Sequence, residues 1–169
     1  MIGLVLVWMS LASLLASPLS RHLPGIHQLS ATRAAASDRE VKIYGATLTG
    51  EQQVPPTGSV ATGVARLQLL NDGSIRWSLH TRGLENVVAA HIHAGAPGLN
   101  GPPVITLFSG DPTSDLHLEG AITDPSQAAV VLQLIQNNTA YVNVHTTAFQ
   151  NGEIRGQLEP KASPAGRER

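Results

Sequence analysis

The sequence predicts an all-β fold, an antiparallel Greek-key β-sandwich or barrel, with one short helix near residues 125–137. Three observations lead to this fold class. Short segments between residues 41 and 160 alternate apolar and polar side chains. Turn-forming Gly, Pro and Asn residues separate those segments, and a single helical pattern interrupts them. Short strands of this kind with one crossing helix are typical of antiparallel sandwiches and barrels.

The clearest strand covers residues 74–80, where Ile75, Trp77 and Leu79 alternate with polar side chains and define one core face. The turn at residues 71–73, Asn-Asp-Gly, joins it to the preceding strand as a hairpin. The expected strands, in chain order, are residues 41–50, 60–70, 74–80, 87–93, 103–108, 115–122, 141–147 and 152–160.

The helix is predicted from its start signal. Asp124 is a favoured N-cap residue and Pro125 stands at the first helical position. Apolar residues then recur at helical spacing up to residue 137.

The two ends of the chain are expected to lie outside the folded domain of residues 41–160. Residues 1–17 are apolar and precede any charged side chain, which is typical of a signal peptide or an N-terminal anchor. Residues 18–40 are expected to be a linker, and residues 161–169 a disordered tail. We therefore expect a secreted or cell-envelope protein, which contacts a membrane only if the N-terminal segment stays uncleaved.

Composition excludes several kinds of site. The chain has no cysteine, so thiolate ligands, disulfides and cysteine nucleophiles are absent. Residues 40–160 carry five Lys or Arg against ten Asp or Glu, a net charge of −5. An acidic domain is a poor nucleic-acid partner, because neutralising phosphates dominates that affinity. Cations are compatible with this charge.

Three histidines stand out because of the strand pattern. In residues 90–93 Ala90 and Ile92 take the core face, which leaves His91 and His93 together on the other face. His145 lies opposite the core pair of its own strand in the same way. Same-face residues in a strand are about 6.5 Å apart, so two imidazoles can lean onto one ion at about 2 Å. We predict a metal site of these three residues, which loses its ion as the pH falls through about 6.5.

Other residues are weaker candidates. His80 joins the site only if its strand borders the site, and Asn143 or a backbone carbonyl can orient a ligand ring. Arg155 is a further accessory residue. Glu153 is either an oxygen ligand or, as we expect, the ion-pair partner of Arg155. A rigid loop follows the histidine pair, and its candidate binding residues are Gly95, Pro97, Gly98, Asn100 and Gly101. The sequence carries none of the motifs of a serine hydrolase, a phosphate-binding loop or an HExxH metalloprotease.

The chain resembles the CHRD domain, a family named for repeats in the animal protein chordin. The resemblance rests on ATLTGEQQVPPTGSVATGVARLQL, AAHIHAGAPGLNGPPVITLF and AYVNVHTTAFQNGEIRGQL, which together span about residues 43–158. It implies an all-β extracellular or envelope module, whose recurring histidines correspond to His91, His93 and His145.

A more distant likeness is to copper–zinc superoxide dismutase, which has a Greek-key β-sandwich. AHIH looks like the copper-binding pair of that family, His145 looks like its late copper ligand, and Arg155 stands where its substrate-guiding arginine would be. The likeness implies a superoxide dismutase-like fold and a metal site more than an activity.

Three functions remain open. The first is non-catalytic or redox-protective binding of one metal ion, copper before zinc. The second is a metal-free module that binds a secreted or cell-surface protein or polymer, with the histidines ordering the loop. The third is superoxide dismutation, which the acidic domain disfavours because steering an anion needs positive potential.

Overall fold

The computed structural model describes residues 42–162, which form one helix and a set of short strands. The strands are β1 (Ile43–Thr49), β2 (Thr62–Leu69), β3 (Ile75–Arg82), β4 (Val87–Ala94), β5 (Pro103–Thr113), β6 (His117–Ile122), β7 (Ala140–Thr146), β8 (Ile154–Gln157) and β9 (Glu159–Lys161), and the helix is α2 (Pro125–Gln136). The expected signal peptide or anchor and the expected linker lie outside the described residues.

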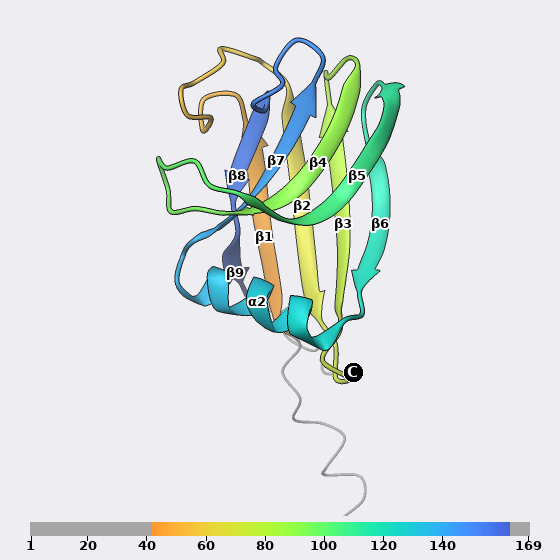
Figure 1. Cartoon of the computed structure of the whole chain (residues 1–169), viewed down its shortest axis with the longest axis vertical. Helices are drawn as coiled ribbons and strands as arrows, with labels where there is room; N and C mark the ends of the chain where they lie inside the picture. The colour runs from red at the N-terminus through yellow and green to blue at the C-terminus, as the bar shows by residue number, and fades with distance from the viewer. Residues whose placement is uncertain (1–41, 163–169) are drawn as a thin grey trace, which may run out of the picture. The chain divides into compact units, whose positions relative to one another are not determined.

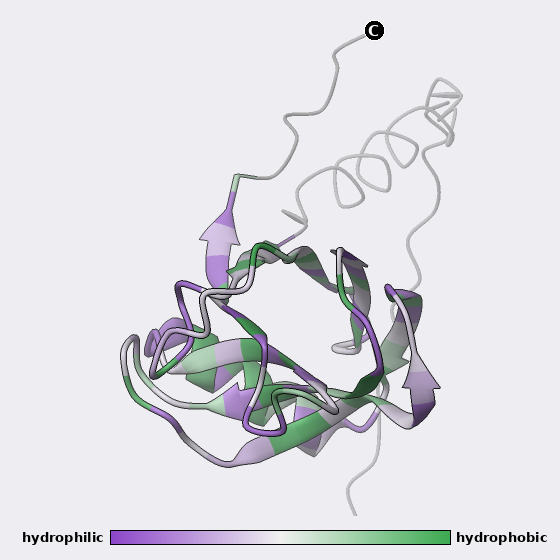
Figure 2. Cartoon of the chain, turned by 90° about the horizontal axis from the view of Figure 1, so that it is seen from above, coloured by the Kyte–Doolittle hydropathy of each residue, from purple (hydrophilic) through white to green (hydrophobic). Residues whose placement is uncertain are grey.

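The strands form a single antiparallel sheet in the order β5-β4-β7-β8-β1-β2-β3-β6, with β9 also paired to β1. β7 returns through α2 to lie beside β4, and β8 lies beside β1 (Figure 1). Such returns of a later strand to an earlier one are the Greek-key pattern. Seen end-on, the sheet curves into a nearly closed ring (Figure 2). The predicted fold class is therefore confirmed.

The inside of this ring is filled with apolar side chains. Leu48 on β1, Ile75 and Leu79 on β3, and Ile92 on β4 are fully buried there. Alternation within the strands predicted the core positions of Ile75, Leu79 and Ile92. The helix α2 lies across one end of the barrel (Figure 1). It buries a stripe of three residues against the core, namely Ala128, Val131 and Ile135.

The helix begins where the sequence predicted. The Asp124 side chain accepts hydrogen bonds from the backbone N–H groups of Ser126 and Gln127, and Pro125 is the first helical residue. Within residues 42–162 no helix is long and apolar enough to span a membrane.

Most strand boundaries differ from expectation by one or two residues, and the single strand expected over residues 152–160 is divided into β8 and β9. Two further differences extend the sheet. β5 continues to Thr113 as an edge strand that pairs only with β4. Lys161, expected in the tail, ends β9 and pairs with Ile43.

β4 is the least regular strand, and its irregularity positions the histidines. Its register against β5 shifts at several points, including those next to His91 and His93. Against β7 the pairing is regular over the same region, with His91 opposite Asn143 and His93 opposite Tyr141. Bulges next to functional sites redirect side chains, so β4 can bend around the histidines while β7 holds their register.

Candidate metal centre

The face of β4 and β7 that points away from the core carries the three candidate histidines. Ala90 and Ile92 on β4 are fully buried on the core side, so His91 and His93 share the opposite side. His145 shares that side from β7, at the position opposite Ala89. Strand alternation therefore placed all three residues on the correct face.

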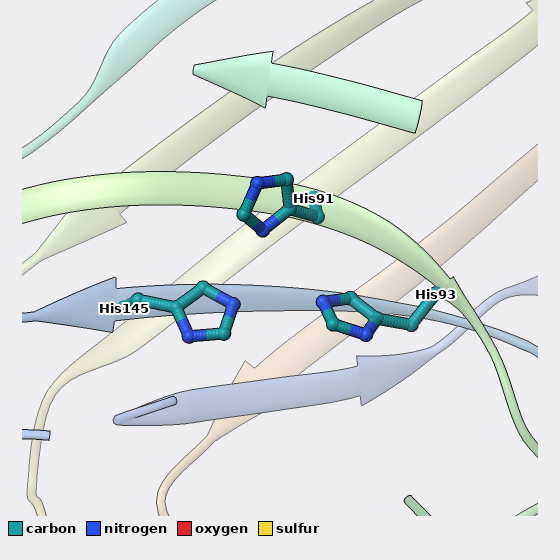
Figure 3. A group of neighbouring side chains, drawn as sticks. All are labelled: His91, His93 and His145. Atoms are coloured by element: carbon teal, nitrogen blue, oxygen red, sulfur yellow. The ribbon is translucent and has the colours of Figure 1, made fainter. Parts of the chain in front are cut away.

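The structure brings these three side chains together. One ring nitrogen from each of His91, His93 and His145 lies within 4.8 Å of the others. The ring centroids are 5.1 Å apart for His91 and His145, and 5.6 Å apart for His93 and His145. The rings of His93 and His145 face each other above β7, and His91 approaches from β4 (Figure 3). Two nitrogens bonded to one ion at about 2.0–2.1 Å are at most about 4.2 Å apart, so the rings must move closer together to bind one ion.

Backbone carbonyls fix the tautomers of two of the rings. His93 donates its Nδ1–H to the carbonyl oxygen of Gly101 at 2.8 Å. His145 donates its Nδ1–H to the carbonyl oxygen of Gln150 at 2.9 Å. A carbonyl can only accept, so Nε2 of each neutral ring keeps a free lone pair. This is the arrangement typical of metal-bound histidine, in which the second ring nitrogen is held by the protein.

The nitrogen atoms that remain have no partner. Nδ1 of His91 and Nε2 of both His93 and His145 are buried, and none has a hydrogen bond within residues 42–162. Buried polar atoms are nearly always hydrogen-bonded in native proteins. Three exceptions gathered in one place therefore mark this cluster as a candidate metal site.

Burial keeps the three imidazoles neutral. Burial, together with the smaller effects of the neighbouring His145 and His93 rings, lowers the pKa of His91 to about 4. Burial also lowers the pKa of His93 and His145, although the hydrogen bonds to Gly101 and Gln150 oppose that shift. Neutral imidazole is the form that binds metal. Protons should therefore compete with a metal ion for these nitrogens only at a pH below the value of about 6.5 expected from the sequence.

Loops cover this outer face. His93 is 7% exposed and His145 is 9% exposed, although their strand positions alone would leave them in solvent. Gln53, from the segment between β1 and β2, donates to the side chain of Asn143. Asn143 in turn donates to the backbone of Asn151, in the segment between β7 and β8. Asn143 therefore joins two covering loops. The hydrogen bonds of the His93 and His145 rings are accepted by the backbone carbonyl oxygens of Gly101 and Gln150, not by Asn143.

The expected ion pair between Arg155 and Glu153 does not form. Arg155 is 2% exposed and donates to the carbonyl oxygens of Ala96 and Leu99, each at 3.0 Å. The Glu153 carboxylate instead accepts hydrogen bonds from Ser59 and Thr146. The prediction was wrong because these neighbours in sequence point their charged groups into different loops.

The candidate binding loop is held from both sides. Ala96 and Leu99 close a turn around Pro97 and Gly98, and Gly98 has the positive φ of 77° that favours glycine in this position. Asn100 donates to the carbonyl oxygen of Val54 in the neighbouring loop at 2.7 Å.

Two glycines of this loop approach the strand closely. A Cβ on Gly101 would collide with the carbonyl oxygen of Ala94. Gly95 donates its N–H to Thr139 and accepts from Gln157 through its carbonyl. The loop residues thus form a support for the histidines, and no side chain of the loop joins the nitrogen cluster.

His80 lies elsewhere. Its strand β3 borders β2 and β6, not β4 or β7. The condition under which His80 would join the three histidines is therefore not met.

Tyr141 is a supporting residue to which the sequence assigned no role. Its ring stacks on His93 with centroids 5.0 Å apart, and the Arg155 guanidinium lies 3.6 Å from its centroid on the ring face. Its hydroxyl also accepts from the N–H of Gly101. Strand parity placed Tyr141 on the same face as His145, which was the signal available.

Comparison with family models gives one match. The model described as the CHRD domain matches residues 44–158, well over half of the chain. The chain belongs to the CHRD domain family. Neither the curated proteins nor the solved structures contain a match to this CHRD domain. The likeness to copper–zinc superoxide dismutase therefore rests on the sequence features already given.

Proposed function

We propose that this CHRD domain binds one transition-metal ion through His91, His93 and His145. The observation that carries the proposal is the set of three converging, buried ring nitrogens without hydrogen-bond partners among the described residues. Each such atom costs about 1–3 kcal/mol when it is left unsatisfied. An ion bound at this point satisfies all three.

The donor set favours copper, with zinc second. Three imidazoles suit copper, zinc, iron or nickel, and affinities for divalent ions of the first row peak at Cu²⁺. The sequence contains no cysteine, and the group of three includes no carboxylate. Hard cations such as Mg²⁺ and Ca²⁺, which prefer oxygen ligands, are disfavoured here.

Binding or redox protection has better support than superoxide turnover. The Arg155 side chain is buried and its guanidinium is already held by Ala96 and Leu99. It is therefore not presented to an incoming anion. The ligand nitrogens are themselves shielded from solvent, which suits holding an ion more than rapid exchange of substrate.

The test is titration of the purified full-length chain with Cu(II) and with Zn(II), followed by calorimetry and electron paramagnetic resonance. We expect stoichiometric binding that is micromolar or tighter, with the spectrum of a nitrogen-ligated Cu(II). His91→Ala and His145→Ala should each lose this first equivalent of copper. Circular dichroism checks that the variants remain folded.

His117→Gln is the matched control, because it also removes one imidazole but leaves the three-histidine group intact. The first equivalent of copper should bind to this variant as it does to the wild type. The proposal fails if the wild-type chain binds no ion, or if His91→Ala and His145→Ala bind it unchanged.

We also propose that the protein is exported. CHRD domains are typically extracellular or secreted, and the apolar N-terminal sequence is of the kind that directs export. Cell fractionation combined with N-terminal sequencing of the mature chain tests this. A chain that keeps Met1 and stays in the cytosolic fraction would contradict it.

A further inference from the structure

A second pair of histidines lies on strands that do not border β4 or β7. His80 on β3 and His117 on β6 are direct partners in the antiparallel register. Their Nδ1 atoms are 3.0 Å apart, and their ring centroids are 5.2 Å apart. Both side chains are exposed, so this pair stands at the surface of the barrel.

The backbone holds the two rings in fixed relation. β3 and β6 pair without a register shift over six consecutive positions, from Ile75 and Ile122 to His80 and His117. The residue before His80, Leu79, is fully buried, which points His80 outward. The side chains of a directly opposed pair lie close enough to interact without movement of the strands.

The distance between the Nδ1 atoms of His80 and His117 suits two ligands of one metal ion. Two imidazole nitrogens bound to one ion at about 2.0–2.1 Å and 3.0 Å apart subtend an angle of roughly 90–100° at the ion. That angle fits neighbouring positions of a square-planar or tetragonal site, which Cu(II) and Ni(II) prefer. A tetrahedral ion such as Zn²⁺ needs a wider angle.

We propose that His80 and His117 form a second metal site, a surface chelate for Cu(II) whose other positions are filled by water. In the metal-free pair one Nδ1 must carry the proton that the other accepts. The ion takes the place of that proton, and the protonated ring moves its proton to Nε2. The pair therefore remains neutral and both Nδ1 lone pairs bind the ion.

Charged side chains of both signs lie on the face that carries this pair. Arg82 follows His80 on the same face of β3, and Glu119 follows His117 on the same face of β6. Neither forms a salt bridge within the described chain. With two protein ligands in solvent, this site should fill after the buried three-histidine group.

The experiment is titration of the full-length chain with Cu(II) beyond one equivalent. The wild type should bind a second equivalent, with the paramagnetic resonance signature of tetragonal Cu(II) bound by two nitrogens. His80→Gln and His117→Gln should each lose that second equivalent and keep the first. Because both residues are exposed, these variants should keep the fold and the stability of the wild type.

Arg82→Gln is the matched control, since it changes an exposed residue of the same strand face without removing a nitrogen ligand. It should retain both equivalents. In His91→Ala the surface signal should persist, so the two sites fail independently. Zn(II) at equal concentration should leave the surface copper signal unchanged.

Two results would overturn the proposal. One is a wild-type chain that binds no copper beyond the three-histidine group, which would leave the histidine pair as a hydrogen bond alone. The other is a second equivalent that survives in both His80→Gln and His117→Gln.

Discussion

The ring nitrogens of His93 and His145 show how single backbone carbonyls select the chemistry of a site. The carbonyl oxygens of Gly101 and Gln150 each accept a hydrogen bond from an Nδ1–H group. The lone pair on Nε2 of each ring is therefore left for the three-histidine cluster. His91 differs, because its buried and unpartnered atom is Nδ1. The three rings therefore present a mixed set of nitrogens without any side-chain carboxylate to orient them.

Stability without metal should depend on pH through these residues. The pKa of His91 is about 4 in the folded chain, against 6.5 when unfolded. Between these values the unfolded chain binds a proton that the folded chain does not, so stability falls as the pH falls from 6.5 towards 4. Below about 4 both states bind the proton and the loss stays constant. His93 and His145 shift in the same direction.

Urea denaturation in the presence of a chelator measures this effect between pH 7.5 and 4.5. The dependence should be flatter in His91→Gln. Asp72 and Asp124, whose pKa values are lowered below 3.8 by hydrogen bonds to Ser74 and Ser126, act only at lower pH. Equal stability of the wild type at pH 7 and pH 5 would contradict the prediction.

Gly152 lies where the backbone leaves no room for a Cβ atom. Its φ is 113°, and a Cβ there would collide with the side chains of Asn143 and Gln53. Gly152→Ala should therefore lower the unfolding free energy by about 1–3 kcal/mol.

Gly98→Ala provides the comparison, because Gly98 also has a positive φ of 77° but no atom within 4 Å of its Cβ position. It should cost less than Gly152→Ala in urea denaturation. Equal losses of stability in the two variants would contradict this prediction, because the Cβ clash at residue 152 would then add nothing to the cost of the positive φ.

At the scale of elements, the covering loops depend on the Arg155 side chain of β8. It binds the 95–101 loop through the carbonyls of Ala96 and Leu99 and packs on the ring of Tyr141. Burial lowers the pKa of Arg155 from its usual value, yet the guanidinium is satisfied by carbonyl oxygens instead of a carboxylate. The loop is thus fastened to β8 and to its neighbour β7, which carries His145.

Arg155→Lys should not preserve this arrangement, because a lysine ammonium reproduces neither the paired donors nor the stacking of a guanidinium. We expect a loss of about 2–4 kcal/mol in unfolding free energy, and faster hydrogen exchange in residues 95–101. Arg76→Lys, at an exposed position of β3, is the control and should change neither quantity. Unchanged exchange in the loop of Arg155→Lys would contradict this role.

The sequence predicts the strands and the three histidines because both depend on local alternation. Val142 and Val144 mark the core side of β7, which is enough to place His145 on the other side. The burial of His145 depends instead on loops distant in sequence, such as the one that carries Gln53. The contact of His80 with His117 depends on which strands are neighbours, and alternation within a strand holds no information about that order.

At the scale of the whole molecule, metal binding and folding should be linked. The three ligands come from β4 and β7, which pair with each other and lie in the middle of the β5-β4-β7-β8 part of the sheet. An unfolded chain does not hold these nitrogens together, so an ion that binds only the folded state stabilises it.

Free copper at a concentration 100-fold above the dissociation constant should raise the unfolding free energy by about 2.7 kcal/mol. Thermal unfolding followed by circular dichroism, with and without copper, measures the shift. His145→Ala should lose most of this shift, because the surface pair His80 and His117 fills only at higher copper concentration. A copper-induced shift in that variant equal to that of the wild type would refute the linkage to this site.

The unpartnered nitrogens of the three histidines also affect which mutations natural selection tolerates. In the metal-free chain they form a locally frustrated patch inside an otherwise consistent fold. Mutations that replace His91 with an apolar residue would relieve that frustration, and drift under selection for folding alone would favour them. Under the proposed function the bound ion satisfies these nitrogens, which removes that frustration without a mutation. Under the proposed function, selection for metal binding and selection for metal-free stability therefore act on these histidines in opposite directions.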